Sequence, residues 1–246
     1  MKLAILADIH ANLEALNACL AHAARQGATR HAFLGDLVGY GADPQACLET
    51  VRRHAADGAI VVRGNHDDAA LGGLQADMHP EAREAIIWTR TQLNAEDRDF
   101  LVTLPYVVEK DDNCFVHASA DHPGDWTYLA GKKAVAQCLA ATHAARVFAG
   151  HVHEPALYFS SREGVSAHLP AAGSRVPLSL SRRWLALVGS VGQPRDGNPT
   201  ASYAILDCAP RQLCFHRVSY DWIRAAAKIR AAGLPERLAA RLEHGL

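Results

Sequence analysis

The sequence predicts one α/β domain over residues 1–246, with a parallel sheet in its first part and a mixed sheet after it. Short apolar runs alternate with amphipathic helical patterns over the first 65 residues, and strand signals dominate from residue 157 onward. No linker, low-complexity stretch or internal repeat interrupts the chain. Strands and helices that alternate at this spacing are typical of parallel strands joined by right-handed crossovers.

The first element is expected to be a buried strand over 3–7, because its apolar run lacks the alternation of a half-exposed strand. Asn12 is a suitable N-cap for the helix that follows, and Gly27 is a suitable end for it. The same signals predict strands over 31–34 and 59–62, and a helix that begins at Asp43 and Pro44.

The middle of the chain is predicted to be more helical, and its last third is predicted to be rich in strands. Helical spacing of apolar residues predicts helices over 80–93, 97–104, 132–143, 221–232 and 235–242. Short apolar runs predict strands over 106–109, 114–116, 146–149, 157–159, 184–188, 201–206 and 212–216.

The composition excludes several classes of function. Hydrophobic residues make up 49% and charged residues 21% of the chain, and no apolar run approaches the roughly 18 residues of a membrane helix. With 25 basic against 26 acidic side chains, the protein lacks the basic excess of a stable nucleic-acid or membrane-surface binder. Six scattered cysteines without a C-x-x-C pair are typical of a reducing compartment. We therefore expect a cytoplasmic protein that has no signal peptide, membrane or nucleic-acid partner.

Polar, metal-ligating residue types follow the ends of five predicted strands. Ligand sites in open α/β sheets form beyond the carboxyl ends of the strands, so these residues are expected to meet at one edge. A single D-x-H or H-x-H is more often structural, but five such elements in order favour a metal site. The residues are Asp8, His10, Asp36, Asn65, His66, His117, His151 and His153.

The chemistry of these side chains indicates the kind of metal. Carboxylate and amide oxygens with imidazoles, and no thiolate, suit Mn, Fe, Zn, Ni or Co. Seven of these eight side chains, all except His66, are candidate ligands, which are too many for one ion and a natural number for two. In D-x-H and H-x-H at a strand end, alternate side chains point the same way, so both members can face the site. A glycine precedes Asp36, Asn65 and His151, which would allow tight turns and close approach of the backbone.

The whole set resembles the calcineurin-like metallophosphoesterase superfamily. The segments 35–41 and 189–197 resemble its small bacterial and archaeal phosphodiesterase branch. The resemblance implies a four-layer α/β/β/α sandwich with two central mixed sheets and a dinuclear metal centre. The motifs that carry it are Asp8-x-His10, Gly35-Asp36, Gly64-Asn65-His66-Asp67, His117 and Gly150-His151-x-His153.

The resemblance also implies a role for each motif residue. His66 would act as the general acid or contact a phosphate oxygen. Manganese is the expected metal, with Fe, Zn, Ni or Co as alternatives. Three ligands would hold the first divalent ion (Asp8, His10 and His153), three the second (Asn65, His117 and His151), and one would bridge them (Asp36).

The implied reaction is hydrolysis of a phosphodiester or phosphomonoester of a small molecule or nucleotide, by attack of a metal-bridging hydroxide. Protein phosphatases of the superfamily carry a phosphate-gripping Arg where this chain has Tyr40. We therefore expect diesters or nucleotides to compete well with simple monoesters. Arg195, in a loop rich in Gly and Pro, is either a substitute substrate-binding cation or a plain loop arginine.

A different class of function stays open. A retromer subunit of this fold binds proteins and is not a catalyst, so this chain could be a non-catalytic protein-binding scaffold. A scaffold need not keep a proton donor and all seven ligands, and both are present here. Loops around 68–80, 119–130 and 170–200 are expected to set the width of the cleft. The tryptophans and the charged face of the last helix are interpreted as structural, and the oligomeric state is not predicted.

Overall fold

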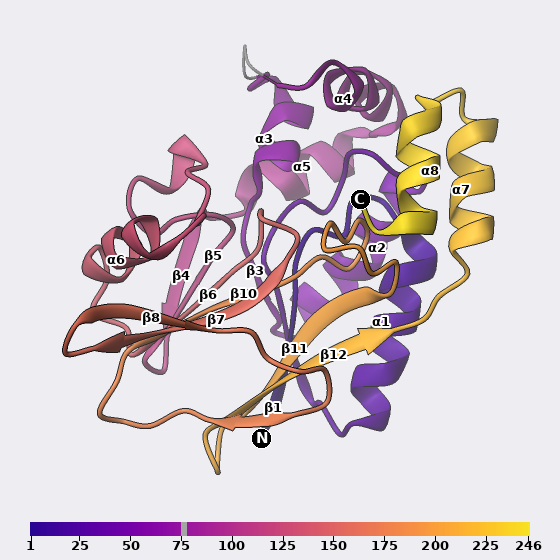
Figure 1. Ribbon diagram of the computed structural model, residues 1–246. Helices are drawn as coiled ribbons and strands as arrows, with labels where there is room; N and C mark the ends of the chain where they lie inside the picture. The colour runs from indigo at the N-terminus through magenta and orange to yellow at the C-terminus, as the bar shows by residue number, and fades with distance from the viewer. Residues whose placement is uncertain (75–77) are drawn as a thin grey trace.

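The computed structural model describes residues 1–74 and 78–246, which form two six-stranded sheets packed face to face (Figure 1). In the first sheet the three N-terminal strands are parallel, as predicted, and the remaining strands join them antiparallel. Its strand order is β3 (Ile60–Val61), β2 (Arg30–Phe33), β1 (Lys2–Leu6), β11 (Ala201–Asp207), β12 (Gln212–Val218) and β9 (Arg175–Pro177).

The second sheet is also mixed. Its three central strands are parallel, and the strands on either side of them are antiparallel. Its strand order is β4 (Val107–Lys110), β5 (Asn113–Val116), β6 (Arg146–Ala149), β10 (Trp184–Val188), β7 (Pro155–Ser161) and β8 (Gly164–His168).

The helices cover the outer faces of the sheets and one end of the molecule. The predicted N-cap of the first helix is present, because the Asn12 side chain accepts a hydrogen bond of 3.1 Å from the Ala15 N–H. The helices among the described residues are α1 (Leu13–Arg25), α2 (Pro44–Ala56), α3 (Asn65–Leu71), α4 (Pro80–Gln92), α5 (Ala95–Thr103), α6 (Lys132–Ala140), α7 (Trp222–Ala231) and α8 (Glu236–His244).

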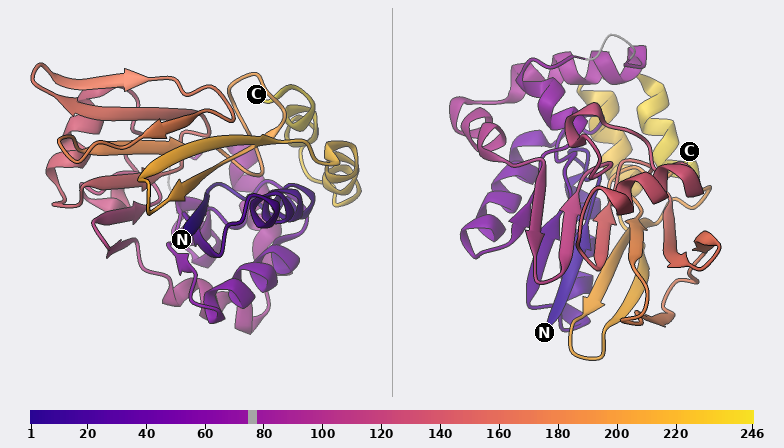
Figure 2. Two further views of the ribbon diagram at one scale, coloured as in Figure 1. Left: turned by 90° about the horizontal axis from the view of Figure 1, so that it is seen from below. Right: turned by 90° about the vertical axis from the view of Figure 1, so that its left-hand side faces the viewer.

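The layers confirm the predicted α/β/β/α sandwich. Between the sheets lies an apolar core in which Phe115 and Phe148 stack with ring centroids 5.6 Å apart. Helices α1 and α2 pack on the outer face of the first sheet, and α6 covers that of the second (Figure 2). Helices α4, α7 and α8 form a further apolar cluster around Tyr40, at the end of the sandwich where the parallel strands finish.

Some elements differ from the predictions. Helix α3 begins at Asn65, inside a motif for which no helix was predicted, and strands β8 and β9 were not predicted because their short sequences carry little apolar pattern. The helix predicted over 132–143 ends at Ala140. All six cysteines are free. Among the described residues, no helix combines the length and the apolar character that crossing a bilayer requires.

Candidate metal centre

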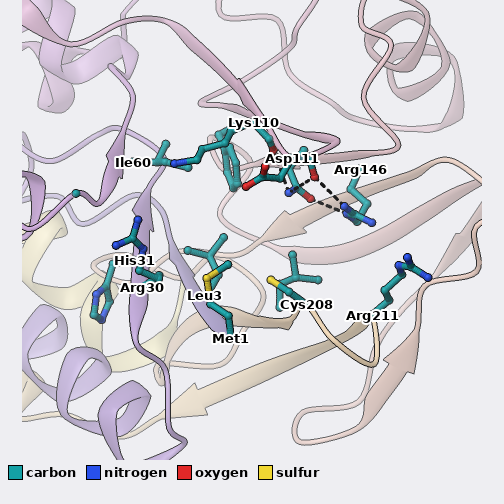
Figure 3. A pocket seen from close by; sticks show the side chains of 14 residues that line it. Met1, Leu3, Arg30, His31, Ile60, Lys110, Asp111, Arg146, Cys208 and Arg211 are labelled. Carbon is teal, nitrogen blue, oxygen red and sulfur yellow. Dashed lines mark hydrogen bonds between the residues drawn. The ribbon is translucent and has the colours of Figure 1, made fainter.

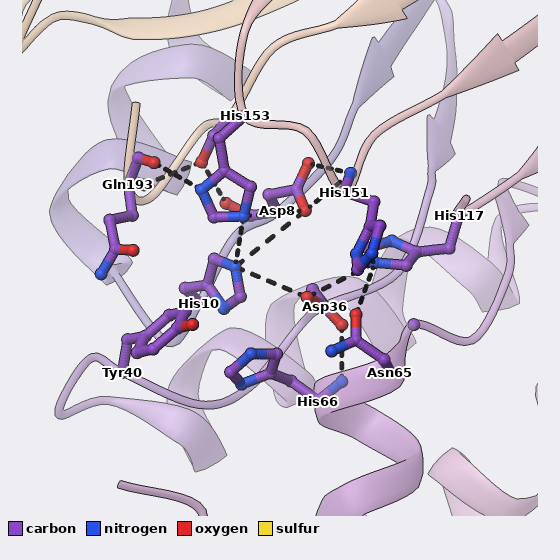
Figure 4. Close-up of polar contacts among 12 residues, drawn as sticks. Asp8, His10, Asp36, Tyr40, Asn65, His66, His117, His151, His153 and Gln193 are labelled. Carbon is purple, nitrogen blue, oxygen red and sulfur yellow. Dashed lines mark hydrogen bonds and ion pairs between the residues drawn. The ribbon is translucent and has the colours of Figure 1, made fainter. Parts of the chain in front are cut away.

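The eight predicted site residues meet beyond the carboxyl ends of the parallel strands of both sheets (Figure 4). Loops after β1, β2 and β3 deliver residues from the first sheet, and loops after β5 and β6 deliver residues from the second. Each of these side chains is at most 9% exposed. The site residues are therefore largely shielded from solvent, and they lie at the junction of the two sheets.

The ligand atoms fall into two groups that share one carboxylate. Within each group the atoms lie within 4.8 Å of one another. The Asn65 amide oxygen joins the second group, 3.0 Å from His117 Nε2. This division matches the ligand sets that the resemblance implies. The first group is Asp8, His10, Asp36 and His153, and the second is Asp36, His117 and His151.

Backbone carbonyls fix the tautomers of three of the imidazoles. A carbonyl oxygen only accepts, so a ring nitrogen beside it must donate its N–H. His10 Nδ1 donates to the Val38 carbonyl at 3.2 Å. The same contact is made to Leu34 by His117 at 2.7 Å and to Gln193 by His153 at 2.6 Å. The neutral form of each ring therefore directs the bare lone pair of Nε2 into the cluster.

In the second group, His117 Nε2 lies 3.2 Å from His151 Nδ1. In the first group, the lone pairs of the neutral His10 and His153 rings point at one another, with the two Nε2 atoms 3.1 Å apart. Two unprotonated nitrogens this close repel each other unless a cation lies among them. A carboxylate, an amide oxygen and converging imidazoles are the donors that a transition metal takes. The residues present therefore fit two divalent ions.

Asp36 is the residue that the two groups share. Its Oδ1 accepts a hydrogen bond of 2.8 Å from the His66 backbone N–H. Its Oδ2 lies 3.6 Å from His10 Nε2 and 3.4 Å from His117 Nε2, so it faces both groups. Asp8 is oriented in a similar way, because the backbone N–H of His151 donates to its carboxylate at 3.0 Å.

Burial and the shared carboxylate set the protonation of the cluster. Burial lowers the pKa of His66 to about 4 and that of His151 to about 3. Burial alone would also lower the pKa of His117, but Asp36 and Asp8 outweigh it and raise that pKa to about 9. The pKa of Asp36 lies well below its usual range, since His117, His66 and His10 outweigh the opposite effect of burial. The carboxylate is therefore ionised.

The backbone brings the D-x-H and H-x-H pairs together by a different route from the predicted strand alternation. Strand β1 ends at Leu6, before the first pair begins. Asp8 and His10 have φ of 53° and 48°, and His151 and His153 have φ of 67° and 65°. Left-handed turns, not extended strands, turn both members of each pair inward. The expected convergence is present, but the reason given for it was wrong.

The glycines that precede the ligands provide the close approach that was expected of them. A Cβ on Gly64 would lie 2.2 Å from Asp36 Oδ1, and one on Gly150 would lie 2.5 Å from Asp8 Oδ2. No side chain fits at either position while the carboxylates keep their places. Gly35 is itself left-handed, with φ of 85°.

A residue to which the sequence analysis gave no role holds two loops together. Asp67 is fully buried, and its carboxylate accepts hydrogen bonds from the backbone N–H groups of Leu37, Val38 and Gly64. These bonds fasten the loop that carries Asp36 to the start of α3, which carries Asn65. Its position in the motif was the only signal in the sequence for this role.

A cavity of about 700 Å³ opens beside the centre. Arg195, the predicted substrate-binding cation, lines it and donates to the Tyr40 hydroxyl at 3.3 Å. Each of the three predicted cleft loops contributes to the lining, although residues 75–77 of the first lie outside the described residues. Tyr40 lines the cavity too, and so do residues to which the sequence analysis gave no site role, among them Trp126, Tyr128 and Arg241.

Two of these residues, Trp126 and Arg241, were interpreted as structural in the sequence analysis. Trp126 packs edge-on against His117, with ring centroids 5.9 Å apart, beside the proposed ligands. Arg241 belongs to the charged face of α8, and the packing of α8 around Tyr40 brings it to the cavity. No local sequence pattern distinguishes a helix arginine that faces solvent from one that faces a site formed by other parts of the chain.

Comparison with known proteins agrees with the fold. Residues 1–211 match the calcineurin-like phosphoesterase superfamily domain. The chain belongs to this superfamily. It is 41% identical to a metallophosphoesterase from Sphaerobacter thermophilus, whose crystal structure superposes with a TM-score of 0.90 over 100% of this chain and 99% of that one. The predicted family and the predicted fold are therefore confirmed.

Two archaeal proteins are also similar. An uncharacterized protein of Methanocaldococcus jannaschii is 37% identical over 245 residues, which cover 98% of this chain and 96% of that protein. A hypothetical protein from Pyrococcus horikoshii, 20% identical, shares the fold with a TM-score of 0.81 over 100% of this chain and 98% of that one. Members of the superfamily are metal-dependent phosphoesterases, and the Asp/His clusters of this chain are able to hold metal ions.

Proposed function

We propose that this protein is a dinuclear metal-dependent phosphoesterase that hydrolyses phosphodiester or phosphomonoester bonds of a small molecule or nucleotide. The observation that carries the proposal is the pair of ligand groups that share Asp36, beside a cavity that Asn65, His66 and His151 line. Asp8, His10 and His153 would hold one ion, Asn65, His117 and His151 the other, and Asp36 both. Bound divalent ions supply Lewis acidity that activates water and neutralises phosphate charge.

The chain itself supplies positive charge for the substrate. Arg195 and Arg241 line the cavity, and neither forms an ion pair with a carboxylate among the described residues. Burial and the nearby Arg195 and Arg237 lower the pKa of Arg241, because each positive group disfavours the next. A bound phosphate would relieve this repulsion. These cations would take the place of the missing arginine at position 40.

His66 is the proposed general acid. Its ring lies beside the Tyr40 ring, with centroids 4.4 Å apart, and the residue lines the cavity next to Asn65. Its low pKa of about 4 describes the buried ring without substrate. A phosphoester anion in the cavity favours the imidazolium and raises this pKa. The alternative role is a neutral N–H that contacts a phosphate oxygen.

The deciding experiment measures turnover after reconstitution with Mn²⁺, using bis-p-nitrophenyl phosphate, p-nitrophenyl phosphate and a panel of nucleotides. We expect metal-dependent hydrolysis, with diesters or nucleotides competing well with simple monoesters. A protein that binds metal and hydrolyses none of these substrates would instead support the scaffold alternative. Strong activity on phosphoserine peptides with none on diesters would contradict the interpretation of Tyr40.

The variant His66→Ala separates the two roles of the imidazole. It should keep near-normal metal content and lose about 10²–10⁴ in kcat on esters with an alkoxide leaving group, the usual size of a general-acid contribution. The loss should be smaller with p-nitrophenolate, which departs without a proton. Equal losses on both substrates would indicate a phosphate contact, and loss of metal would show that the assignment of the histidines is mistaken.

A further inference from the structure

A second cavity, of about 400 Å³, lies at the opposite end of the sandwich from the candidate metal centre (Figure 3). It is lined where strands begin or hairpins turn, by residues such as Leu3 near the start of β1 and Arg211 just before β12. The metal centre lies beyond the other ends of β1, β5 and β6. Among the described residues, the two cavities share no lining residue.

The floor of this cavity is apolar. Leu3, Phe115 and Leu206 line it, and they belong to the core between the two sheets. Ile60, at the start of β3, adds a further aliphatic side chain to the lining. The inter-sheet core thus forms the bottom of the cavity, and a ligand in the cavity would face both sheets. Water at such a surface is readily displaced by an apolar group.

The rim of the cavity is strongly basic, although the chain as a whole is close to neutral. The Arg146 guanidinium is braced, since it donates to Asn113 Oδ1 at 2.6 Å and to the Asp111 carbonyl at 3.1 Å. The other three basic side chains form no ion pair within residues 1–74 and 78–246. The basic residues are Arg30, Lys110, Arg146 and Arg211, against one lining carboxylate, Asp111.

We propose that this cavity binds a small amphiphilic anion, with an apolar or aromatic body between the sheets and a carboxylate, phosphate or sulfonate at the basic rim. An inorganic anion would leave water in contact with the apolar floor. A neutral apolar molecule would leave the cations of the rim without an anionic partner. Figure 3 shows Arg30 on one side of the cavity and Arg146 and Arg211 on the other, so a head group has cations on both sides. The volume falls within the range of small-molecule sites.

The test uses a pair of fluorescent probes that differ in one charge. Anilinonaphthalene sulfonate has an aromatic body and an anionic group, and N-phenylnaphthylamine has the same rings without the sulfonate. We expect the anionic probe to bind about tenfold more tightly, and its affinity to fall as salt is added. Equal affinity for the two probes, or no binding of the sulfonate, would overturn the proposal.

Variants locate the bound probe. Lys110 and Arg211 are exposed, so Lys110→Gln and Arg211→Gln should fold and should each weaken sulfonate binding by about fivefold. Lys133→Gln, at an exposed position on α6, is the matched control and should change nothing. Arg241→Gln, at the metal-centre cavity, should also leave binding intact. If Arg241→Gln weakened binding and the rim variants did not, the probe would lie in the other cavity and the proposal would fail.

A labelling experiment adds an independent readout. Cys208 lines the cavity and is half-buried, whereas the half-buried Cys214 lies outside it. Bound sulfonate should slow alkylation of Cys208 and leave Cys214 unaffected, as read by peptide mass mapping. Competition by decanoate, decyl phosphate and adenosine monophosphate then identifies the head group and body that the site prefers. Displacement by none of the three would count against the proposal.

Discussion

At the scale of single residues, the proposed ligands hold a costly backbone conformation. A non-glycine residue in the left-handed region costs about 1–3 kcal/mol, and Asp8, His10, Asp36, His151 and His153 are all found there. Hydrogen bonds between the loops offset part of this cost. The backbone N–H of Asp8 donates to the Gly35 carbonyl at 3.1 Å, and that of His10 donates to the Asp36 carbonyl at 2.9 Å. The ligands are therefore held in place by neighbouring loops before any cation binds.

The two arginines of the metal-centre cavity give a prediction at the same scale. Arg195→Gln and Arg241→Gln should each raise KM for a phosphoester by about tenfold or more, because a hydrogen bond to a charged group is lost. The effect on kcat should be smaller, since neither side chain belongs to the proposed ligands. Steady-state kinetics on bis-p-nitrophenyl phosphate would measure both constants.

The control is Arg237→Gln, on the same helix as Arg241. Arg237 is exposed and lies 3.9 Å from Glu81, and it does not line the cavity. This variant should leave KM unchanged. An equal rise in KM for Arg237→Gln would show that α8 acts through its net charge and not through a contact with the substrate.

The sequence predicted the identity of the site residues better than their geometry. The order of residue types at strand ends was enough to select Asp36 and the histidines, because the ability to bind a metal depends on the type of side chain, which the sequence states directly. Arg241 could not be found this way, since its place depends on how α8 packs around Tyr40. The left-handed conformation of His10 was also invisible, because the motif Asp-x-His is equally compatible with an extended strand.

At the scale of elements, the contact between α1 and β12 should make stability depend on pH. His216 of β12 packs against Tyr203, with ring centroids 5.2 Å apart, and against His22 of α1, at 5.1 Å. Burial, followed by His22, Lys2 and Arg175, lowers the pKa of His216 to about 4. The unfolded chain therefore takes up the proton first as the pH falls.

Because the unfolded chain is protonated before the folded protein, stability should decrease as the pH falls. The stabilisation by neutral His216 is complete above the unfolded pKa of about 6.5 and is lost as the pH falls towards about 4. Because the ring is only half-buried, we expect the loss to be about 1 kcal/mol. Urea unfolding at pH 7.5 and pH 5 should show a smaller loss for His216→Gln than for the wild type. His168→Gln, at an exposed position on β8, should behave like the wild type.

Elements were predictable where their pattern was long or their ends were marked. The N-cap Asn12 and the apolar spacing after it gave α1, and the alternating order of strands and helices gave the parallel part of the first sheet. Helix α3 was missed, because Gly64-Asn65-His66-Asp67 is rich in turn formers and the helix has only seven residues. Strand β9 has three residues and is placed by its pairing with β12, which is a tertiary effect.

At the scale of the whole molecule, the proposed centre joins the two sheets. Asp8, His10, Asp36 and Asn65 come from loops of the first sheet, whereas His117, His151 and His153 come from loops of the second. Asp36 contacts histidines from both sides, through His10 and His117. A cation held by both sheets would oppose their separation on unfolding, so metal binding and global stability should be linked.

This linkage gives a prediction for thermal unfolding. Each ion that binds only the folded state stabilises it by about 2.7 kcal/mol when present at about 100 times its dissociation constant. For a chain of this length that corresponds to a rise in Tm of about 5–10 °C for each bound ion. Mn²⁺ should therefore raise the Tm of the metal-free protein by this amount, and a chelator should reverse the rise. Differential scanning calorimetry would measure both steps.

The variant Asp36→Asn tests whether the shared carboxylate links metal binding to thermal stability. It removes negative charge from both ligand groups at once, so metal content, the rise in Tm and turnover should fall together. Asp99→Asn, at an exposed position on α5, should keep the full rise and is the matched control. Circular dichroism of the metal-free variants establishes that each is folded before metal is added. If Asp36→Asn kept the wild-type rise in Tm, Asp36 would not be the bridge, and the two sheets would have to be linked through other ligands.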